Sequence, residues 1–127
     1  MTRNEFVNSW IAALNSGDYR QARDRLVKGR KNPSYCCLGV ACVVSNNNGY
    51  VGGIDIYDND LHEGGLPIPL AKKLNVTVSG SFIEHVEHNG VSFTSLIDLN
   101  DYGQARFKTI ARVIREQWDA KNFLPYP

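Results

Sequence analysis

Three cysteines within seven positions of one another, Cys36, Cys37 and Cys42, are the side chains best suited to nucleophilic chemistry. A thiol enzyme needs a cysteine activated beside a base, and His85 or His88 could be that base for Cys36 or Cys37. No known nucleophile signature surrounds either cysteine. The sequence therefore favours small buried thiols and a protein that is not an enzyme, with a Cys/His-dependent enzyme as the alternative.

The cysteines also lack the spacing of a disulfide framework or a zinc site. A secreted framework spreads an even number of cysteines along the chain, whereas here the number is odd and the cysteines are clustered. Structural zinc sites typically contain Cys-x2-Cys pairs, which the Cys-Cys-x4-Cys arrangement does not. We expect reduced thiols, no metal and no cofactor.

A basic zone at residues 20–31 is the strongest electrostatic feature. Clustered Arg and Lys can bind the phosphates of nucleic acid or of a nucleotide, and the flanking Tyr19 and Tyr35 could stack on bases. The alternative is a solvated face balanced by acidic residues elsewhere. Asp24 is the only acid among these residues. The six cations are Arg20, Arg23, Arg25, Lys28, Arg30 and Lys31.

An acidic loop follows, in a stretch from Pro33 to Ala71 that contains no Lys or Arg. Its alternating carboxylates resemble a calcium loop but lack the glycine and the final glutamate of an EF-hand. We interpret it as a solvated loop, or as a partner surface that mimics nucleic-acid phosphates against a basic groove. Its acids are Asp55, Asp58, Asp60 and Glu63.

Composition limits the class of protein. The chain has 127 residues, of which 43% are hydrophobic and 21% charged, as is ordinary for one folded domain over residues 1–127. Its formal charge of +1 excludes a wholesale polycation. The longest apolar run is far shorter than a membrane span, and the first residues show no signal pattern. We expect a cytosolic protein with no membrane partner.

The elements that would position these residues give an α+β fold, with three main helices packed around a small antiparallel sheet. Thr2 and Glu5 have capping-box spacing before a helix over 3–15. Residues 36–45 are apolar all round and favour a buried helix over a buried strand, with Ser34 as its N-cap. A final helix over 104–118 could begin at Gly103 or Asp101. Shorter helices are predicted over 18–27 and up to Asn75.

The best strand signal is a hairpin at 82–97, because Asn89-Gly90 is the pair that a type I′ turn demands. That register pairs His88 with Val91, Val86 with Phe93, Glu84 with Ser95 and Phe82 with Ile97. An irregular acidic and Gly-rich excursion occupies 45–65, with a short strand at 54–56. The extended Pro-rich tail at 119–127 could pack on its own chain or on a second copy in a homodimer.

Taken together, these residues resemble a group of small proteins of tailed bacteriophages whose function is unknown. The resemblance covers most of the chain except the 45–65 loop and the tail, and the Tyr-Cys-Cys-Leu-Gly-Val core is its most specific part. The parts are, in order, Trp10, ALxSGxYxQ at 13–21, YCCLGVxC at 35–42, Leu66-Pro67 and Leu99-Asn100-Asp101.

The resemblance implies a viral protein in the cytoplasm of a bacterial host and supplies no catalytic residues. Small accessory phage proteins often act by binding, so the leading hypothesis is a non-enzymatic protein that inhibits a host component, such as an antiviral defence system. Its partner would be a host protein or complex. The alternatives are a nucleotide- or nucleic-acid-binding protein that uses the basic zone, and the small thiol enzyme.

Overall fold

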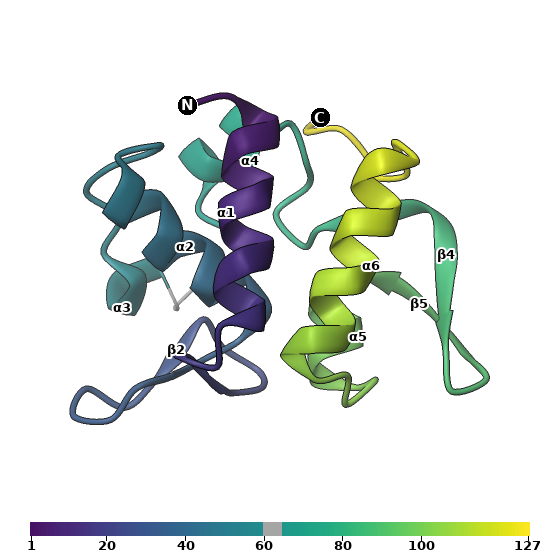
Figure 1. Ribbon diagram of the computed structural model, residues 1–127, viewed down its shortest axis with the longest axis horizontal. Coiled ribbons are helices and arrows are strands. Elements are labelled where there is room, and N and C mark those ends of the chain that lie inside the picture. Colours follow the sequence, from purple (N-terminus) through teal and green to yellow (C-terminus); the bar gives the residue numbers. More distant parts are fainter. Residues whose placement is uncertain (60–64) are drawn as a thin grey trace.

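A computed structural model describes residues 1–59 and 65–127 (Figure 1). The helices are α1 (Arg3–Asn15), α2 (Cys37–Asn48), α3 (Ile56–Asn59), α4 (Ile68–Leu74), α5 (Leu96–Asp101) and α6 (Phe107–Asp119). The strands are β1 (Arg20–Gln21), β2 (Val27–Lys28), β3 (Ser34–Tyr35), β4 (Ser81–His88) and β5 (Val91–Ser95). The α+β class is confirmed. None of the helices in the described part of the chain is long and apolar enough to cross a membrane.

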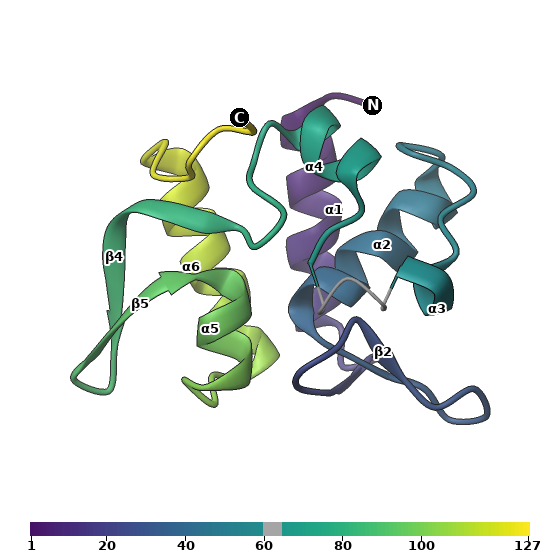
Figure 2. The same cartoon turned by 180° about the vertical axis from the view of Figure 1, so that it is seen from behind.

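Helix α1 begins as predicted. The Thr2 hydroxyl accepts the Glu5 backbone N–H, and the Glu5 carboxylate accepts the Thr2 N–H, which completes the capping box. Hydrogen bonds from Thr2 lower the pKa of the exposed Glu5 carboxyl. The buried stripe of Phe6, Trp10 and Leu14 packs α1 between α2 and α6 (Figure 1). Figure 2 shows α4 lying across the other side of α1.

Helix α2 confirms a helix rather than a strand, but its N-cap is Cys36 and not Ser34. The Cys36 sulfur accepts the Gly39 N–H at 3.4 Å, while Ser34 belongs to β3. A Cβ on Gly39 would lie 2.0 Å from the carbonyl oxygen of Leu26. Only glycine therefore lets α2 approach the backbone before β2 this closely.

The predicted helix at 18–27 is wrong. Strands β1, β2 and β3 form a small sheet in which β3 lies in the middle, parallel to β1 and antiparallel to β2. Asp24 adopts a left-handed φ of 73°, which a helix interior does not accommodate. The spacing of Tyr19, Ala22 and Leu26 fits a helix face, yet side-chain bonds to distant residues hold this segment extended, as described below.

The hairpin of β4 and β5 confirms the pairs His88–Val91 and Val86–Phe93 beside the Asn89-Gly90 turn. The two further pairs are wrong, because a register shift places Ser81 rather than Glu84 opposite Ser95. Ile97 does not pair with Phe82, since it lies in α5, where the Ser95 hydroxyl caps the helix by accepting the Asp98 N–H. Phe82 pairs instead with Phe123.

The other boundaries follow from the same kind of local contact. Helix α4 ends at Asn75 as expected, in a left-handed conformation. Helix α6 begins after Arg106 rather than at Gly103 or Asp101, because Asp101 ends α5 and Gln104 adopts a left-handed φ of 53°. Residues 56–59 form α3, so the predicted strand at 54–56 is wrong. The tail packs on its own chain, where the Leu124 N–H donates to the Ser81 carbonyl.

Candidate functional site

The three cysteines are packed inside the protein. Cys36 and Cys37 are buried, the Cys37 carbonyl accepts the Trp10 indole N–H at 2.9 Å, and the Cys37 thiol donates to the Leu96 carbonyl at 3.8 Å. Burial raises the pKa of the Cys37 thiol well above its ordinary value. His85 is exposed on β4, and this strand lies at the outer side of the molecule in Figure 1. This arrangement does not supply an activated thiolate.

Cys42 is also buried, and its burial strongly raises the pKa of its thiol. Among the described residues, no three His, Cys, Asp or Glu side chains gather in a way that could hold a metal ion. Neither thiol nor metal chemistry therefore defines a site in this part of the chain.

The structure describes only part of the acidic loop, because Asp60 and Glu63 lie outside the described residues. Asp55 is used locally: its carboxylate accepts the backbone N–H groups of Tyr57 and Asp58 at 3.1 and 3.2 Å and so begins α3. Asp58 is exposed on that helix. A capping role accounts for Asp55 without a partner protein.

The basic zone faces solvent on the sheet of β1, β2 and β3 and its connecting turns. Arg23 is half-buried and the other five cations are exposed. This segment lies at the lower end of the molecule in Figure 1. We use the name basic surface for the side chains of Arg20, Arg23, Arg25, Lys28, Arg30 and Lys31.

Helix α3 packs against the turn between β2 and β3, which joins the acidic and basic zones. The Tyr57 hydroxyl donates to the Gly29 carbonyl at 3.0 Å, and the Arg30 guanidinium lies 4.3 Å from the centre of the Tyr57 ring. This cation–π contact orients Arg30. Sequence reasoning missed Tyr57, because nothing local to residues 54–59 indicates a partner 28 positions away.

Tyr19 and Tyr35 flank the basic surface and contact each other. Both are half-buried, and their rings meet edge to face with centroids 5.7 Å apart. Burial is the main reason that the pKa of the Tyr35 hydroxyl is raised, with Tyr57 and Tyr19 adding to it. The contact between the two rings stabilises this sheet, and their stacking on a base remains a prediction.

A buried asparagine holds the basic surface in place. Asn100 is fully buried, and its side-chain oxygen accepts the Gln21 amide at 3.0 Å and the Cys37 N–H at 3.2 Å. Its amide donates to the Ala22 carbonyl at 2.9 Å and to the Asp101 carboxylate at 2.9 Å. One side chain therefore links β1, the start of α2 and α5.

Two further contacts complete this network. The Gln21 amide also donates to the Ala105 carbonyl at 2.8 Å, and the Asp101 carboxylate accepts the Asp24 N–H at 3.0 Å. The residues involved come from parts of the sequence pattern that stand far apart: Gln21, Cys37 and Asn100-Asp101. Asn and Asp after an apolar helix could have signalled a buried polar pair, but their partners could not be read from spacing alone.

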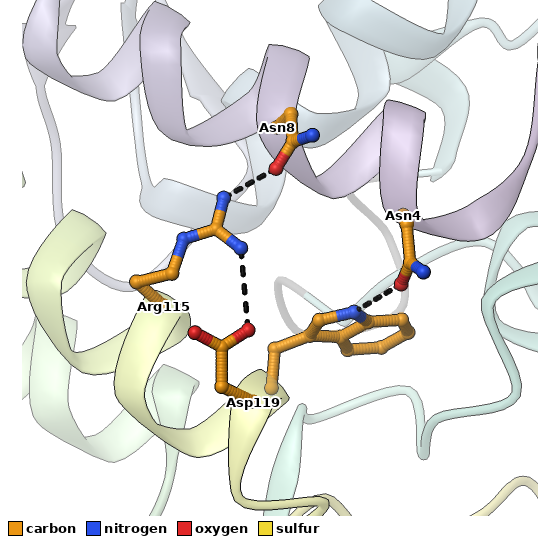
Figure 3. A network of polar contacts seen from close by, with 5 residues as sticks. Asn4, Asn8, Arg115 and Asp119 are labelled. Carbon is orange, nitrogen blue, oxygen red and sulfur yellow. Dashed lines mark hydrogen bonds and ion pairs between the residues drawn. The ribbon is translucent and has the colours of Figure 1, made fainter.

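An open groove of about 470 Å³ lies at the other end of the molecule, between α1 and α6. Figure 3 shows how its walls are held: Arg115 bonds to Asn8 and, at 3.3 Å, to Asp119, while the Trp118 indole donates to Asn4 at 2.8 Å. The bonds to Asn8 and Asn4 join the two helices, and the Arg115–Asp119 pair lies within α6. We therefore interpret the groove as part of the packing interface between α1 and α6.

Comparison with known proteins covers one part of the chain. Residues 2–53 match the model of a family described as a domain of unknown function (DUF8296). No curated protein and no solved structure gives a significant match. The matched segment contains α1, the sheet of β1, β2 and β3, and α2, so it includes the whole basic surface but not Asn100.

Proposed function

We propose that the protein is a non-enzymatic binding protein whose basic surface contacts the phosphates of a nucleic acid. The observation that carries this proposal is the exposure of five cations on one short segment that a buried side-chain network holds in place. Clustered cations attract a phosphate backbone and release its counterions, which gives binding without a sequence code. A pinned backbone lowers the ordering cost of that contact.

The biological setting of the proposal rests on the resemblance to small phage proteins. In that setting the protein acts in the cytoplasm of a bacterial host and inhibits a host component that itself handles nucleic acid, such as an antiviral defence complex. A host protein within that complex would be a partner as well. The tail gives no support for a homodimer, since Phe123 and Leu124 contact Phe82 and Ser81 of the same chain.

The test uses two charge-reversal variants with the same change in net charge. Lys28→Glu/Lys31→Glu alters two exposed side chains of the basic surface, and Lys108→Glu/Arg112→Glu alters two exposed side chains of α6. Fluorescence anisotropy with a labelled single-stranded oligonucleotide and the matching duplex gives both affinity and salt dependence.

We expect the wild-type protein to bind and its affinity to fall steeply with salt. Lys28→Glu/Lys31→Glu should weaken binding about tenfold or more and lower the salt slope by about 1.4 for the single strand, at about 0.7 per phosphate contact. The α6 variant should stay within about twofold. Absence of wild-type binding, or equal losses in both variants, would overturn the proposal.

A further inference from the structure

The connection between α5 and α6 lies directly against the segment that carries the basic surface. Asp101 accepts the Asp24 N–H at 3.0 Å, and the Ala105 carbonyl accepts the Gln21 amide at 2.8 Å. Both residues of the Asp24–Asp101 pair are followed by an exposed residue: Arg25 follows Asp24, and Tyr102 follows Asp101. Residues nearly 80 positions apart thus meet at one end of the protein.

Tyr102 stands out in this connection because 74% of its surface is exposed, the largest value among the exposed large hydrophobic side chains of the described chain. Arg106 is also exposed, four residues later and next to Ala105. Two cations are thus close to Tyr102 along the chain: Arg25 follows Asp24, which bonds to Asp101, and Arg106 is four residues after Tyr102.

The backbone on both sides of this contact is held in an unfavourable conformation. Asp24 has a φ of 73° and Gln104 a φ of 53°, a region that side-chain-bearing residues rarely adopt. Such conformations persist where surrounding contacts impose them, and they concentrate at functional sites. Here the Gln21, Asn100 and Asp101 bonds impose them, so the loop that carries Tyr102 is fixed rather than free.

Arg23 of the basic surface is only partly covered by the protein. Its Nε–H is buried and has no hydrogen-bond acceptor within the described residues, although the side chain as a whole is only half-buried. A buried donor without an acceptor is costly. The part of the Arg23 side chain that remains accessible to solvent is the part that can meet a phosphate oxygen, which guanidinium N–H groups bind well.

We propose that Tyr102 is a stacking platform for an unpaired base, and that Arg23, Arg25 and Arg106 contact the adjacent phosphates of a single-stranded nucleic acid. This inference rests on the proposed function and narrows its ligand. An exposed aromatic ring stacks on any base of a single strand, whereas the paired bases inside a duplex have no free face. Tyr19 and Tyr35 are half-buried and contact each other, so Tyr102 offers the more exposed ring.

The test compares Tyr102→Ala with Tyr102→Phe, which keeps the ring. Ile83→Ala is the matched control, because Ile83 is an exposed apolar residue of β4. Each variant is titrated against a thymidine oligonucleotide, an abasic strand of the same length and charge, and a duplex. Because Tyr102 is exposed, all three variants should melt at the wild-type temperature, which circular dichroism checks.

Tyr102→Ala should bind the thymidine strand about tenfold more weakly, while Tyr102→Phe and Ile83→Ala stay within about twofold. Affinity for the abasic strand and the duplex should not change in any variant. If Tyr102→Ala binds the thymidine strand like wild type while binding stays sensitive to salt, this inference is wrong and the proposed function stands. If wild type binds none of the three ligands, the proposed function itself fails.

Discussion

The two small sheets lie on different sides of the molecule and are built in different ways (Figure 1). Strands β4 and β5 have eight and five residues, and a tight turn joins them in the chain. Strands β1, β2 and β3 have two residues each. A two-residue strand has too few backbone bonds to hold its place alone, so Asn100, Gln21 and Asp101 hold the second sheet through side chains.

Charge follows the same division. Residues 81–95 contain no Lys or Arg and carry Glu84 and Glu87, whereas residues 20–31 carry six cations and one acid. The sheet that depends on distant residues is thus the one that presents the basic surface. The proposed binding surface therefore depends on residues from distant parts of the chain. We expect that changes in the hairpin of β4 and β5 leave this surface unaltered.

The largest predicted effect is that of Gly39→Ala. The new Cβ would lie 2.0 Å from the Leu26 carbonyl oxygen and 2.9 Å from its carbonyl carbon, and backbone atoms cannot move aside cheaply. We expect a loss of about 3 kcal/mol or more in the free energy of unfolding, measured with urea. Gly52→Ala, with nothing within 4 Å, is the control and should change stability by less than about 0.5 kcal/mol. Equal stabilities would mean that α2 does not pack on this backbone.

The next effect is that of Asn100→Ala, which tests whether the basic sheet depends on the network. The substitution removes the acceptor of the Cys37 N–H and the donor to the Ala22 carbonyl, both of which are buried. We expect about 2–3 kcal/mol of destabilisation and weaker oligonucleotide binding at temperatures where the variant is still folded. Asn47→Ala, at an exposed position of α2, should alter neither property. Wild-type binding by a destabilised but folded Asn100→Ala would separate the network from the basic surface.

The same division explains which elements the sequence predicts. The capping box of Thr2 and Glu5 and the Asn89-Gly90 turn are local signals, and the elements they indicate are correct at those positions. The β4–β5 register fails farther from the turn, where a bulge and the Ser95 cap of α5 intervene. Local spacing carries no information about such an interruption.

The sheet of β1, β2 and β3 was not predicted, for a different reason. Two-residue strands leave no hydrophobic periodicity, and the apolar positions of residues 18–27 fit a helix equally well. The partners that decide between the two structures, Asn100 and Ala105, lie about 80 positions away. The cations of the surface were found from composition, whereas Tyr57, Tyr102 and the buried Arg23 Nε–H could be found only from the structure.

The third prediction concerns pH, because Cys37 and Cys42 are buried thiols. Burial raises the pKa of Cys37 and Cys42 above the ordinary 9.0, so these thiols ionise more readily in the unfolded chain. Their contribution to stability is therefore complete below about pH 9 and is lost as the pH rises above it. The free energy of unfolding, measured with urea, should therefore decrease between about pH 8 and pH 10.

The control for this prediction is Cys37→Ala/Cys42→Ala, which removes both buried thiols. Its overall stability should be lower, but the decrease between the two pH values should be smaller than in the wild type. Ellman's reagent should label the wild-type cysteines slowly at neutral pH, at a rate set by opening of the structure. Rapid labelling of Cys37 in the folded protein would contradict its burial and return the thiol enzyme to consideration.

The smallest predicted effect tests the independence of the hairpin. Gly90 has a φ of 79° with nothing within 4 Å of a new Cβ, so Gly90→Ala costs only backbone strain, about 1 kcal/mol. Gly90→Asn should cost about half as much, because Asn adopts this conformation more readily. Hydrogen exchange should quicken in β4 and β5 alone, and oligonucleotide affinity should match the wild type. If the oligonucleotide affinity of Gly90→Ala falls although the rest of the protein stays folded, the two sheets are coupled. The connection would be α5, which begins directly after β5 and contains Asn100.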